Sequence, residues 1–351
     1  MRNQTVLLIT PWEREGGIAT YSRYISSELD SLVDIKVYPW DYESFILRGL
    51  GLELFKYSFL KSLLDADTVH IQYTFGRYVL STLPLVFLSK MFGCNLVITQ
   101  HERFDNLIFE ELIHYYHQVI YFGFDSVIVH TKTRKEIVWS GHHDKVEVIP
   151  HGVICRDSCK IVPDAIEEIV IPGMVRPNKR HDNLIKSLEY LPARIEIQMV
   201  GRKDSMSFPL IGDLIGNGYF SEIECLVNSS SISNRVEWCQ EFVSEDDLFH
   251  IIDSADLIVL PYDSSSAMSG IIAHCVSFKT PVLVTGSETF RDVFSEDEVF
   301  LDGNSPKEIA SSVMRAQDQV VRQKIINELS EKSIEYSWRE IANCTAKTYS
   351  C

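Results

Sequence analysis

Residues 168–190 read EIVIPGMVRPNKRHDNLIKSLEY, and this stretch decides the fold class. Its first five residues, Glu168–Pro172, form an apolar run of the length of a buried strand. A turn follows at Gly173, and the apolar spacing over Asp182–Tyr190 predicts a helix. An apolar strand that leads through a turn into a helix is typical of a parallel sheet covered on both faces. The stretch therefore predicts a doubly wound α/β domain.

The same alternation of short apolar runs and helices extends in both directions. Toward the C-terminus the expected strands are Arg194–Val200, Arg235–Trp238, Leu257–Leu260 and Pro281–Val284, with helices at Glu245–Ser254 and Gly270–Ser277. Toward the N-terminus they are Val6–Thr10, Asp34–Tyr38, Thr68–Gln72, Leu96–Thr99, Ser126–His130 and Lys145–Ile149, with a helix at Ile18–Leu29. A polar segment at about 154–166 separates the two sets. We therefore expect two doubly wound domains joined by a linker there.

The composition disfavours several classes of protein. The chain has 351 residues, which suits two domains of about 150 residues each. A net charge of -16 disfavours a nucleic-acid partner. The longest apolar segment, Val79–Phe92, is interrupted by Pro84 and Lys90 and is too short to cross a bilayer. The cysteines form no C-x-x-C pair, so we expect free thiols. We expect a cytoplasmic protein and leave attachment to the inner face of a membrane open.

Two cations follow the expected strand at Glu168–Pro172. Arg176 and Lys179 lie just before a helix, at the carboxyl end of a parallel strand, where α/β sheets bind their ligands. An arginine fork together with a lysine point charge suits a diphosphate. A solvated loop is the alternative interpretation.

Two helix starts are candidates for phosphate binding through backbone amides. Gly16 and Gly17 follow the first strand but do not complete a G-x-G-x-x-G pattern, so a plain strand–helix turn is the alternative. Ser269 and Gly270 open an apolar helix after a serine-rich loop, and Ser269 is either a helix cap or part of a phosphate site.

Two histidines lie where a ligand of these sheets would bind. His101 follows the strand at Leu96–Thr99, where its imidazole could exchange hydrogen bonds with a reacting substrate. His274 lies one turn into the helix at Gly270–Ser277. A structural role is the alternative for both. The adjacent histidines at 142–143 do not make a closed metal site, and we expect no metal.

Four segments in order resemble the retaining glycosyltransferases of the GT-B fold, most closely family 4. They are GGIATYSRYISSEL at 16–29, VIPHGV at 148–153, GMVRPNKRHDNLI at 173–185 and VLPYDSSSAMSGIIAHCVSFKTPVLVT at 259–285. The resemblance implies an enzyme that moves a sugar from a nucleotide-diphosphate sugar to a saccharide or lipid-linked acceptor, without a metal or other cofactor. It also implies an acceptor-side domain at 1–153, completed by a C-terminal helix at about 331–351, and a donor-binding domain at 166–330.

The resemblance implies roles for individual residues. The candidates for the donor diphosphate are Gly17, Arg176, Lys179, Ser269, Gly270 and Ile271. His101 would approach the transferred sugar, and it joins Arg176 and Lys179 as a candidate catalytic residue. Many family members carry a Glu-x7-Glu pair, whereas this chain has Ser266 and His274 at those positions. Ser266 and His274 are therefore further candidates for contacts to the donor ribose or sugar.

The missing glutamates keep two alternatives open. One is a catalytically silent homologue that acts as a scaffold for a partner glycosyltransferase, and the other is a nucleotide-sugar epimerase. The sequence does not identify the acceptor, although enzymes of this kind often build surface polysaccharides or glycoconjugates. The segment Phe45–Leu64 is either an amphipathic region that touches a membrane or, as we favour, a helix of the core.

Overall fold

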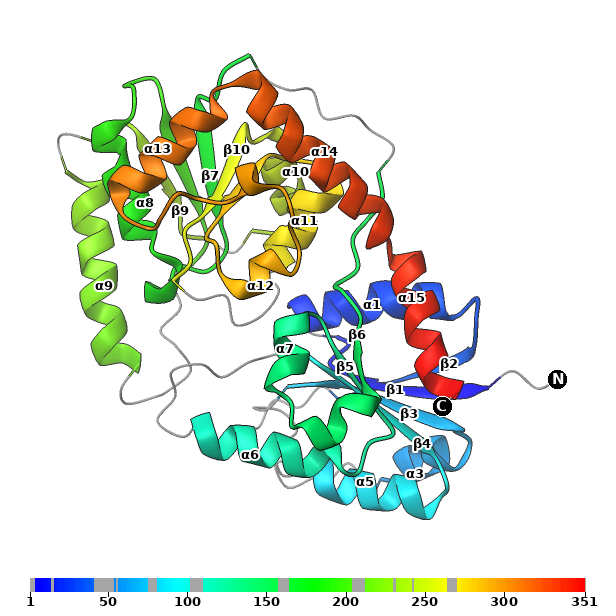
Figure 1. Ribbon diagram of the computed structural model, residues 1–351. Coiled ribbons are helices and arrows are strands. Elements are labelled where there is room, and N and C mark those ends of the chain that lie inside the picture. The colour runs from blue at the N-terminus through cyan, green and yellow to red at the C-terminus, as the bar shows by residue number, and fades with distance from the viewer. Residues whose placement is uncertain are drawn as a thin grey trace. The chain divides into compact units, whose positions relative to one another are not determined.

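The computed structural model describes residues 4–13, 16–40, 54, 56–74, 81–101, 110–156, 164–203, 212–229, 232–241, 243–263 and 270–350. The chain forms two compact units (Figure 1). One consists of Met1–Gly152 with Tyr336–Cys351, and the other of Val153–Ser265 with Ser269–Glu335. Each unit holds one parallel sheet, which confirms the predicted fold class of two doubly wound α/β domains.

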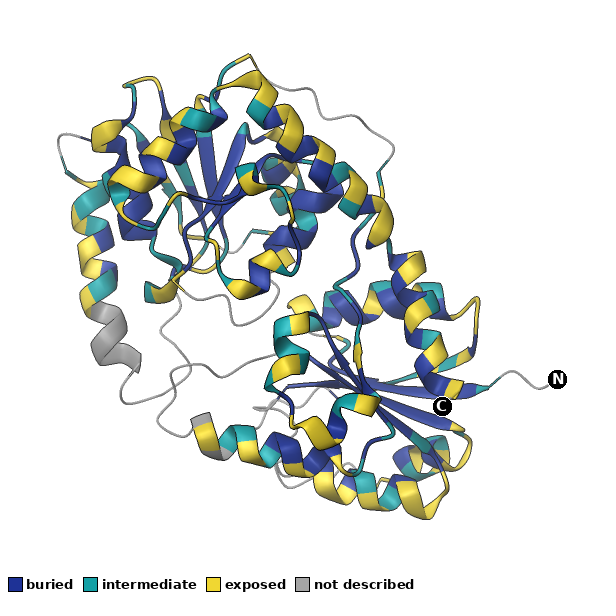
Figure 2. Ribbon diagram, in the orientation of Figure 1, coloured by how far each residue is buried: buried dark blue, intermediate teal, exposed yellow. Residues whose placement is uncertain are grey.

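The first unit contains a six-stranded parallel sheet in the order β2-β1-β3-β4-β5-β6. Its strands are β1 (Thr5–Thr10), β2 (Asp34–Pro39), β3 (Thr68–Tyr73), β4 (Asn95–Gln100), β5 (Ser126–Val129) and β6 (Val146–Val148). The connecting helices are α1 (Gly17–Leu29), α3 (Tyr57–Leu64), α5 (Thr82–Met91), α6 (Glu110–Tyr121) and α7 (Lys132–Ile137). All residues of β1 and β3 are buried, because helices cover both faces of the sheet (Figure 2).

The second unit contains a five-stranded parallel sheet in the order β11-β10-β7-β8-β9. Its strands are β7 (Glu168–Pro172), β8 (Glu196–Val200), β9 (Val236–Cys239), β10 (Leu257–Leu260) and β11 (Val282–Val284). Its helices are α8 (His181–Ser187), α9 (Gly212–Val227), α10 (Glu245–Ser254), α11 (Gly270–Phe278), α12 (Glu288–Arg291), α13 (Pro306–Ala316) and α14 (Gln319–Glu335). The strands form the buried centre of the unit and the outer faces of the helices are exposed (Figure 2).

The last helix, α15 (Trp338–Lys347), packs against α1 in the first unit. The indole of Trp338 stacks on Tyr24 with ring centroids 5.5 Å apart, and it meets Tyr21 edge-on at 5.0 Å. A Cβ on Gly152 would lie 2.2 Å from the same indole, so this position requires glycine. This last segment of the first unit begins at Tyr336 rather than at about residue 331, because α14 continues to Glu335.

The described part of the predicted segment Phe45–Leu64 includes α3, whose Phe59 and Leu63 are completely buried in the core of the first unit. This burial agrees with a core helix, and most of the segment before α3 lies outside the described residues. Within the part of the chain that the structure describes, no helix has the length and apolar character needed to span a membrane.

Candidate functional site

The candidate diphosphate site lies where β7 ends in the second unit. Here the strand order changes direction, since β8 and β9 lie on one side of β7 and β10 and β11 on the other. Open α/β sheets bind ligands at the carboxyl ends of the strands that flank such a point. Gly173 follows β7, and Tyr262 follows β10 by two residues. The predicted cations after Gly173 therefore lie at the edge of the sheet where a ligand is expected.

Lys179 is seated against the turn that precedes it. The residue ends a short 3-10 helix, Pro177–Lys179, whose first position suits the fixed φ of proline. Gly173 has φ +105°, and a Cβ built on it would lie 2.8 Å from Nζ of Lys179. The same Cβ would lie 3.8 Å from Cγ1 of Ile271, near the start of α11. The missing side chain of Gly173 thus lets the lysine ammonium and the first turn of α11 approach one point.

The charge of Lys179 also shapes its surroundings. Its Nζ lies 5.2 Å from the centre of the Tyr262 ring, a cation–π distance. Burial, with the nearby lysine charge as the second cause, lowers the pKa of His181 to about 3, so this histidine is neutral. Arg176 is half-buried, with Nη2 3.9 Å from Sδ of Met174. The second predicted cation therefore lies on the same loop, along the side chain of Met174.

The start of α11 at Gly270 is open to solvent. Gly270 is the first residue of α11, it is exposed, and a Cβ built on it would meet nothing within 4 Å. The next residues, Ile271 and Ile272, are buried and fix the helix in the unit. The first amides of a helix have no partner within the helix and carry a partial positive charge, so they can hold a phosphate. Ser266 and Ser269 lie outside the described residues.

His274 lies on α11 with its ring edge-on to Phe249 of α10, at a centroid distance of 5.0 Å. The residue is half-buried. This contact shows a packing role between the two helices, which was the alternative to ligand binding. A hydrogen bond from His274 to a donor ribose stays a prediction.

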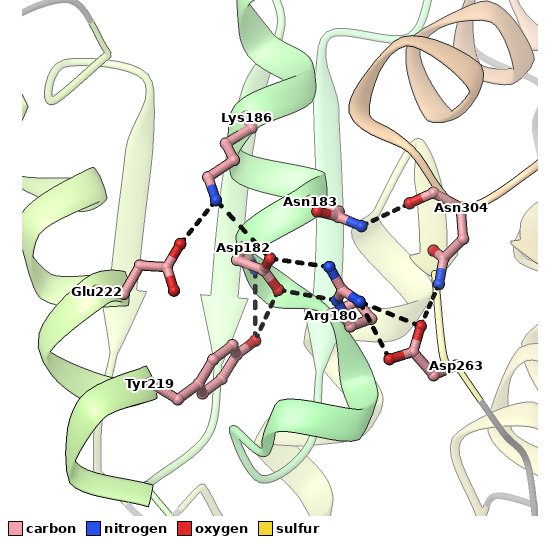
Figure 3. A network of polar contacts seen from close by, with 8 residues as sticks. All are labelled: Arg180, Asp182, Asn183, Lys186, Tyr219, Glu222, Asp263 and Asn304. Carbon is pink, nitrogen blue, oxygen red and sulfur yellow. Dashed lines mark hydrogen bonds and ion pairs between the residues drawn. The ribbon is translucent and has the colours of Figure 1, made fainter. Parts of the chain in front are cut away.

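A polar network that the sequence analysis missed fixes the loop of Lys179 (Figure 3). Arg180 has left-handed backbone, with φ +52°, and its guanidinium pairs with Asp182 at 3.2 Å and with Asp263 at 3.2 Å. Asp263 accepts a hydrogen bond from Asn304 at 2.8 Å, and its backbone N–H donates to the carbonyl of Asn178 at 2.9 Å. The loops after β7 and β10 are thereby tied together next to Lys179.

The same network continues from Asp182 to α9 (Figure 3). The hydroxyl of Tyr219 donates to Oδ1 of Asp182 at 3.3 Å, and Lys186 bridges Asp182 at 3.9 Å and Glu222 at 2.7 Å. Asp182 is almost completely buried. Burying a carboxylate is costly unless it is paired and hydrogen-bonded. The partners of Asp182 meet this need, so the network stabilises the first turn of α8 behind the candidate site.

In the first unit, His101 belongs to a histidine cluster at the carboxyl edge of the sheet. We define this cluster as His70, His101, His130 and His151. The ring of Tyr21 on α1 lies 4.7 Å from that of His101, 5.4 Å from that of His130 and 5.1 Å from that of His151. The sequence analysis identified His101 but not the cluster, because its members lie on or after strands that are far apart in the sequence.

Both ring nitrogens of His101 have partners. Nε2 donates to Oε1 of Gln72 at 2.7 Å, since that oxygen can only accept. Nδ1 lies 3.3 Å from Nε2 of His130, whose own Nδ1 donates to the carbonyl of Ile149 at 2.8 Å. When both rings are neutral, Nδ1 of His101 and Nε2 of His130 each point a lone pair at the other, and no hydrogen bond joins them. The pair is therefore fully hydrogen-bonded only when it holds one additional proton.

Burial opposes that proton. It is the main cause that lowers the pKa of His130 to about 4, and it lowers the pKa of His101 well below its ordinary value. Nδ1 of His70 lies 2.8 Å from the hydroxyl of Tyr349, and Nε2 lies 2.8 Å from the hydroxyl of Thr99. Burial lowers the pKa of His70 to about 3. The histidine cluster is therefore neutral at pH 7 and offers hydrogen bonds rather than charge.

We expect the free energy of unfolding to fall as the pH drops below about 6.5. The unfolded chain then binds protons at His70 and His130, whereas the folded protein does not until about pH 3 and 4. Each of these groups should cost up to about 1.4 kcal/mol per pH unit. Urea unfolding at several pH values between 7.5 and 4.5 measures the slope. His70→Gln should reduce it, and an unchanged slope in that variant would show that His70 is not responsible.

Gly17 starts α1 directly after the loop that follows β1. The preceding Gly16 has φ +143°, and the helix has no side-chain cap at its N-terminus. Gly17 is exposed, and a Cβ on it would meet nothing within 4 Å. The strand–turn–helix arrangement predicted here is confirmed, and the role of Gly17 toward a ligand stays a prediction.

Two doubly wound domains, each with candidate groups at the carboxyl edge of its sheet, define the GT-B class of glycosyltransferase folds. Residues 163–333 match the family described as glycosyl transferases group 1. That range contains Arg176, Lys179, Gly270 and Ile271. The match and the fold confirm the resemblance to GT-B glycosyltransferases that the sequence motifs indicate.

Solved structures with the same fold extend over nearly the whole chain. HepE of Anabaena, in complex with UDP and glucose, is 14% identical with a TM-score of 0.71 and covers 99% of both chains. A glycosyltransferase of Rickettsia africae is 15% identical with a TM-score of 0.70, covering 99% of this chain and 98% of its own. Sucrose-phosphate synthase of Thermosynechococcus elongatus is 16% identical with the same score and coverage. No curated protein sequence matches the chain.

Proposed function

We propose that this protein is a retaining glycosyltransferase of the family 4 type, which moves a sugar from a nucleotide-diphosphate sugar to a saccharide or lipid-linked acceptor. The observation that carries the proposal is the position of the Lys179 ammonium group. Its ammonium lies against Gly173 and beside the first turn of α11, at the switch point of a sheet whose domain matches glycosyl transferases group 1. A diphosphate placed there would meet a cation and helix amides together.

The chemistry follows from the charge of the leaving group. As the glycosidic bond breaks, negative charge grows on the departing diphosphate. Lys179, Arg176 and the first amides of α11 would stabilise that charge, a task that some enzymes give to a metal ion. The proposal therefore includes no metal. The acceptor hydroxyl would attack from the face that the leaving group departs from, so the anomeric configuration would be retained.

His101 has a separate role in the proposal. Its ring is neutral and its Nε2–H donates to Gln72, so His101 would exchange this hydrogen bond for one to the transferred sugar. We propose that His101 positions this sugar by hydrogen bonding. The reaction would take place in the cytoplasm, with polysaccharide or glycoconjugate biosynthesis as the class of pathway and a membrane-face acceptor as one substrate form.

The test is a calorimetric titration of the protein with UDP, GDP and ADP. The complex of HepE with UDP makes UDP the first nucleotide to try. We expect one of the three to bind, and the double variant Arg176→Ala, Lys179→Ala to lose that binding while its far-UV circular dichroism stays unchanged. Binding that persists in the double variant would place the nucleotide elsewhere and contradict the proposal.

A silent scaffold is the second candidate function. Ser266 and His274 replace the two glutamates of the family pattern, and the ring of His274 is engaged with Phe249. A folded protein that binds none of the three nucleotides would favour this role. An epimerase, in contrast, would convert a nucleotide sugar in the absence of any acceptor, and this can be followed by NMR of the donor.

A further inference from the structure

A cavity of about 560 Å³ opens in the first unit between α6, α7 and the end of β4. Its lining includes Gln100, the last residue of β4 and the neighbour of His101 in the chain. The volume is within the range of about 300–1,000 Å³ that small-molecule sites occupy. The carboxyl end of a parallel strand is also where ligands of this fold class bind. The cavity therefore has the size and the place of a ligand site.

The inner part of the cavity is polar, neutral and fixed. The hydroxyl of Tyr121 donates to Oε1 of Gln100, and Nε2 of Gln100 donates to Nδ1 of His117 at 3.4 Å. All three side chains are buried. Burial is the main cause that lowers the pKa of His117 to about 3, so the ring is neutral and carries its hydrogen on Nε2. Gln100, His117 and Tyr121 therefore offer uncharged hydrogen-bond donors and acceptors in fixed directions.

Two aromatic rings form the outer part of the cavity lining. Tyr115 of α6 is 57% exposed and Trp139 is 39% exposed, and their rings meet edge-on with centroids 5.6 Å apart. The backbone N–H of Trp139 donates to Oε1 of Gln118 at 3.0 Å, and Nε2 of Gln118 donates to Nε2 of His114 at 3.3 Å. Gln118 is buried, so it holds the backbone of Trp139 and the imidazole of His114 in place.

The described lining carries one positive and one negative formal charge, Arg134 and Glu111. Their formal charges sum to zero, and the whole chain has a net charge of -16. An anionic ligand would therefore be repelled at long range by the protein. The electrostatics favour a neutral ligand.

We propose that this cavity binds a neutral pyranose unit of the acceptor. A pyranose has an apolar face of C–H groups, which suits the rings of Tyr115 and Trp139, and a rim of hydroxyl groups, which suits Gln100 and His117. The inference rests on the proposed function, since it names the substrate class of the acceptor side. It adds a second site in the first unit to the one proposed at His101.

The experiment is saturation-transfer difference NMR with the methyl glycosides of glucose, galactose, mannose and N-acetylglucosamine, and with methyl glucuronide as the charged probe. We expect at least one neutral glycoside to bind with millimolar affinity and the glucuronide to bind about tenfold more weakly or not at all. Trp139→Ala and Tyr115→Ala should each weaken the binding by about tenfold. Tyr57→Ala is the matched control, because Tyr57 is an 81% exposed tyrosine on α3 that does not line the cavity.

UDP binding is measured on the same samples so that the two proposals fail separately. Binding of UDP without any neutral glycoside would overturn the cavity proposal and leave the glycosyltransferase proposal standing. Glycoside binding without binding of any nucleotide would overturn the glycosyltransferase proposal and leave the cavity standing as a sugar site. Displacement of the glycoside by UDP, tighter binding of the glucuronide, or binding that survives both aromatic substitutions would each show that the cavity is not a site for a neutral sugar. Should Trp139→Ala fail to fold, Tyr115→Ala decides alone.

Discussion

Lys179→Ala is expected to weaken nucleotide binding by about 10- to 100-fold and to lower kcat/KM for sugar transfer by about 100- to 1,000-fold. The reason is the position of the Lys179 ammonium group. Nζ lies beside Gly173 and the first turn of α11, where charge would build on the leaving diphosphate. The loss of transition-state stabilisation should exceed the loss in binding, because the diphosphate carries more charge as the bond breaks.

Lys324→Ala is the matched control for this substitution. Lys324 also lies in the second unit, on α14, but its ammonium pairs with Glu298 at 2.6 Å, outside the network around Arg180. The two variants remove the same charge from the same domain. If both lowered nucleotide affinity equally, the effect would be the general change in net charge, and Lys179 would lose its assigned role.

Gly201→Ala is expected to lower the free energy of unfolding by about 2–4 kcal/mol and to abolish nucleotide binding. Gly201 follows β8 with φ +151°, and a Cβ on it would lie 2.2 Å from the carbonyl oxygen of Gly173 and 2.6 Å from its carbonyl carbon. Both partners are backbone, so no side chain can rotate away. The displaced turn is the one against which Lys179 rests, which is why stability and binding should fail together.

Gly218→Ala provides the control for Gly201→Ala. Gly218 lies inside α9, and a Cβ there would meet nothing within 4 Å. Alanine is the better helix former, so this variant should be as stable as the native protein or more stable by up to about 1 kcal/mol. Urea unfolding and nucleotide titration measure both variants. A Gly201→Ala protein with native stability would show that the turns after β7 and β8 can separate without cost.

The sequence predicts the central strands well because their apolar runs are buried. The predicted strand Glu168–Pro172 is identical to β7, and Thr68–Gln72 differs from β3 only by Tyr73. The strand order could not be predicted, since β1 lies between β2 and β3, and β7 between β10 and β8, through long-range pairing that no local pattern encodes. The switch points, and with them the positions of the candidate sites, therefore come from the structure.

Local sequence patterns predicted only part of the candidate site, because the rest depends on residues that are far apart in the sequence. Lys179 and Gly173 are close in sequence, and the spacing pointed to them. Arg180 and Asp263 are 83 residues apart, and nothing in either segment indicates that they pair. His114 and His117 have helical spacing and lie on α6, but the sequence did not show that Trp139 would complete a cavity beside them.

The segment after Tyr336 has a consequence for how the protein is made. Gln4 donates to the backbone carbonyl of Tyr349 at 2.7 Å, and the Tyr349 hydroxyl reaches His70 at 2.8 Å, so the first sheet is completed by residues synthesised after the second unit. At about 5–20 residues per second, the ribosome needs about ten seconds or more to produce the second unit in between. The second unit can thus fold as soon as it emerges, whereas the N-terminal strands must wait, and a premature stop codon before Tyr336 would spare the downstream domain and damage the upstream one.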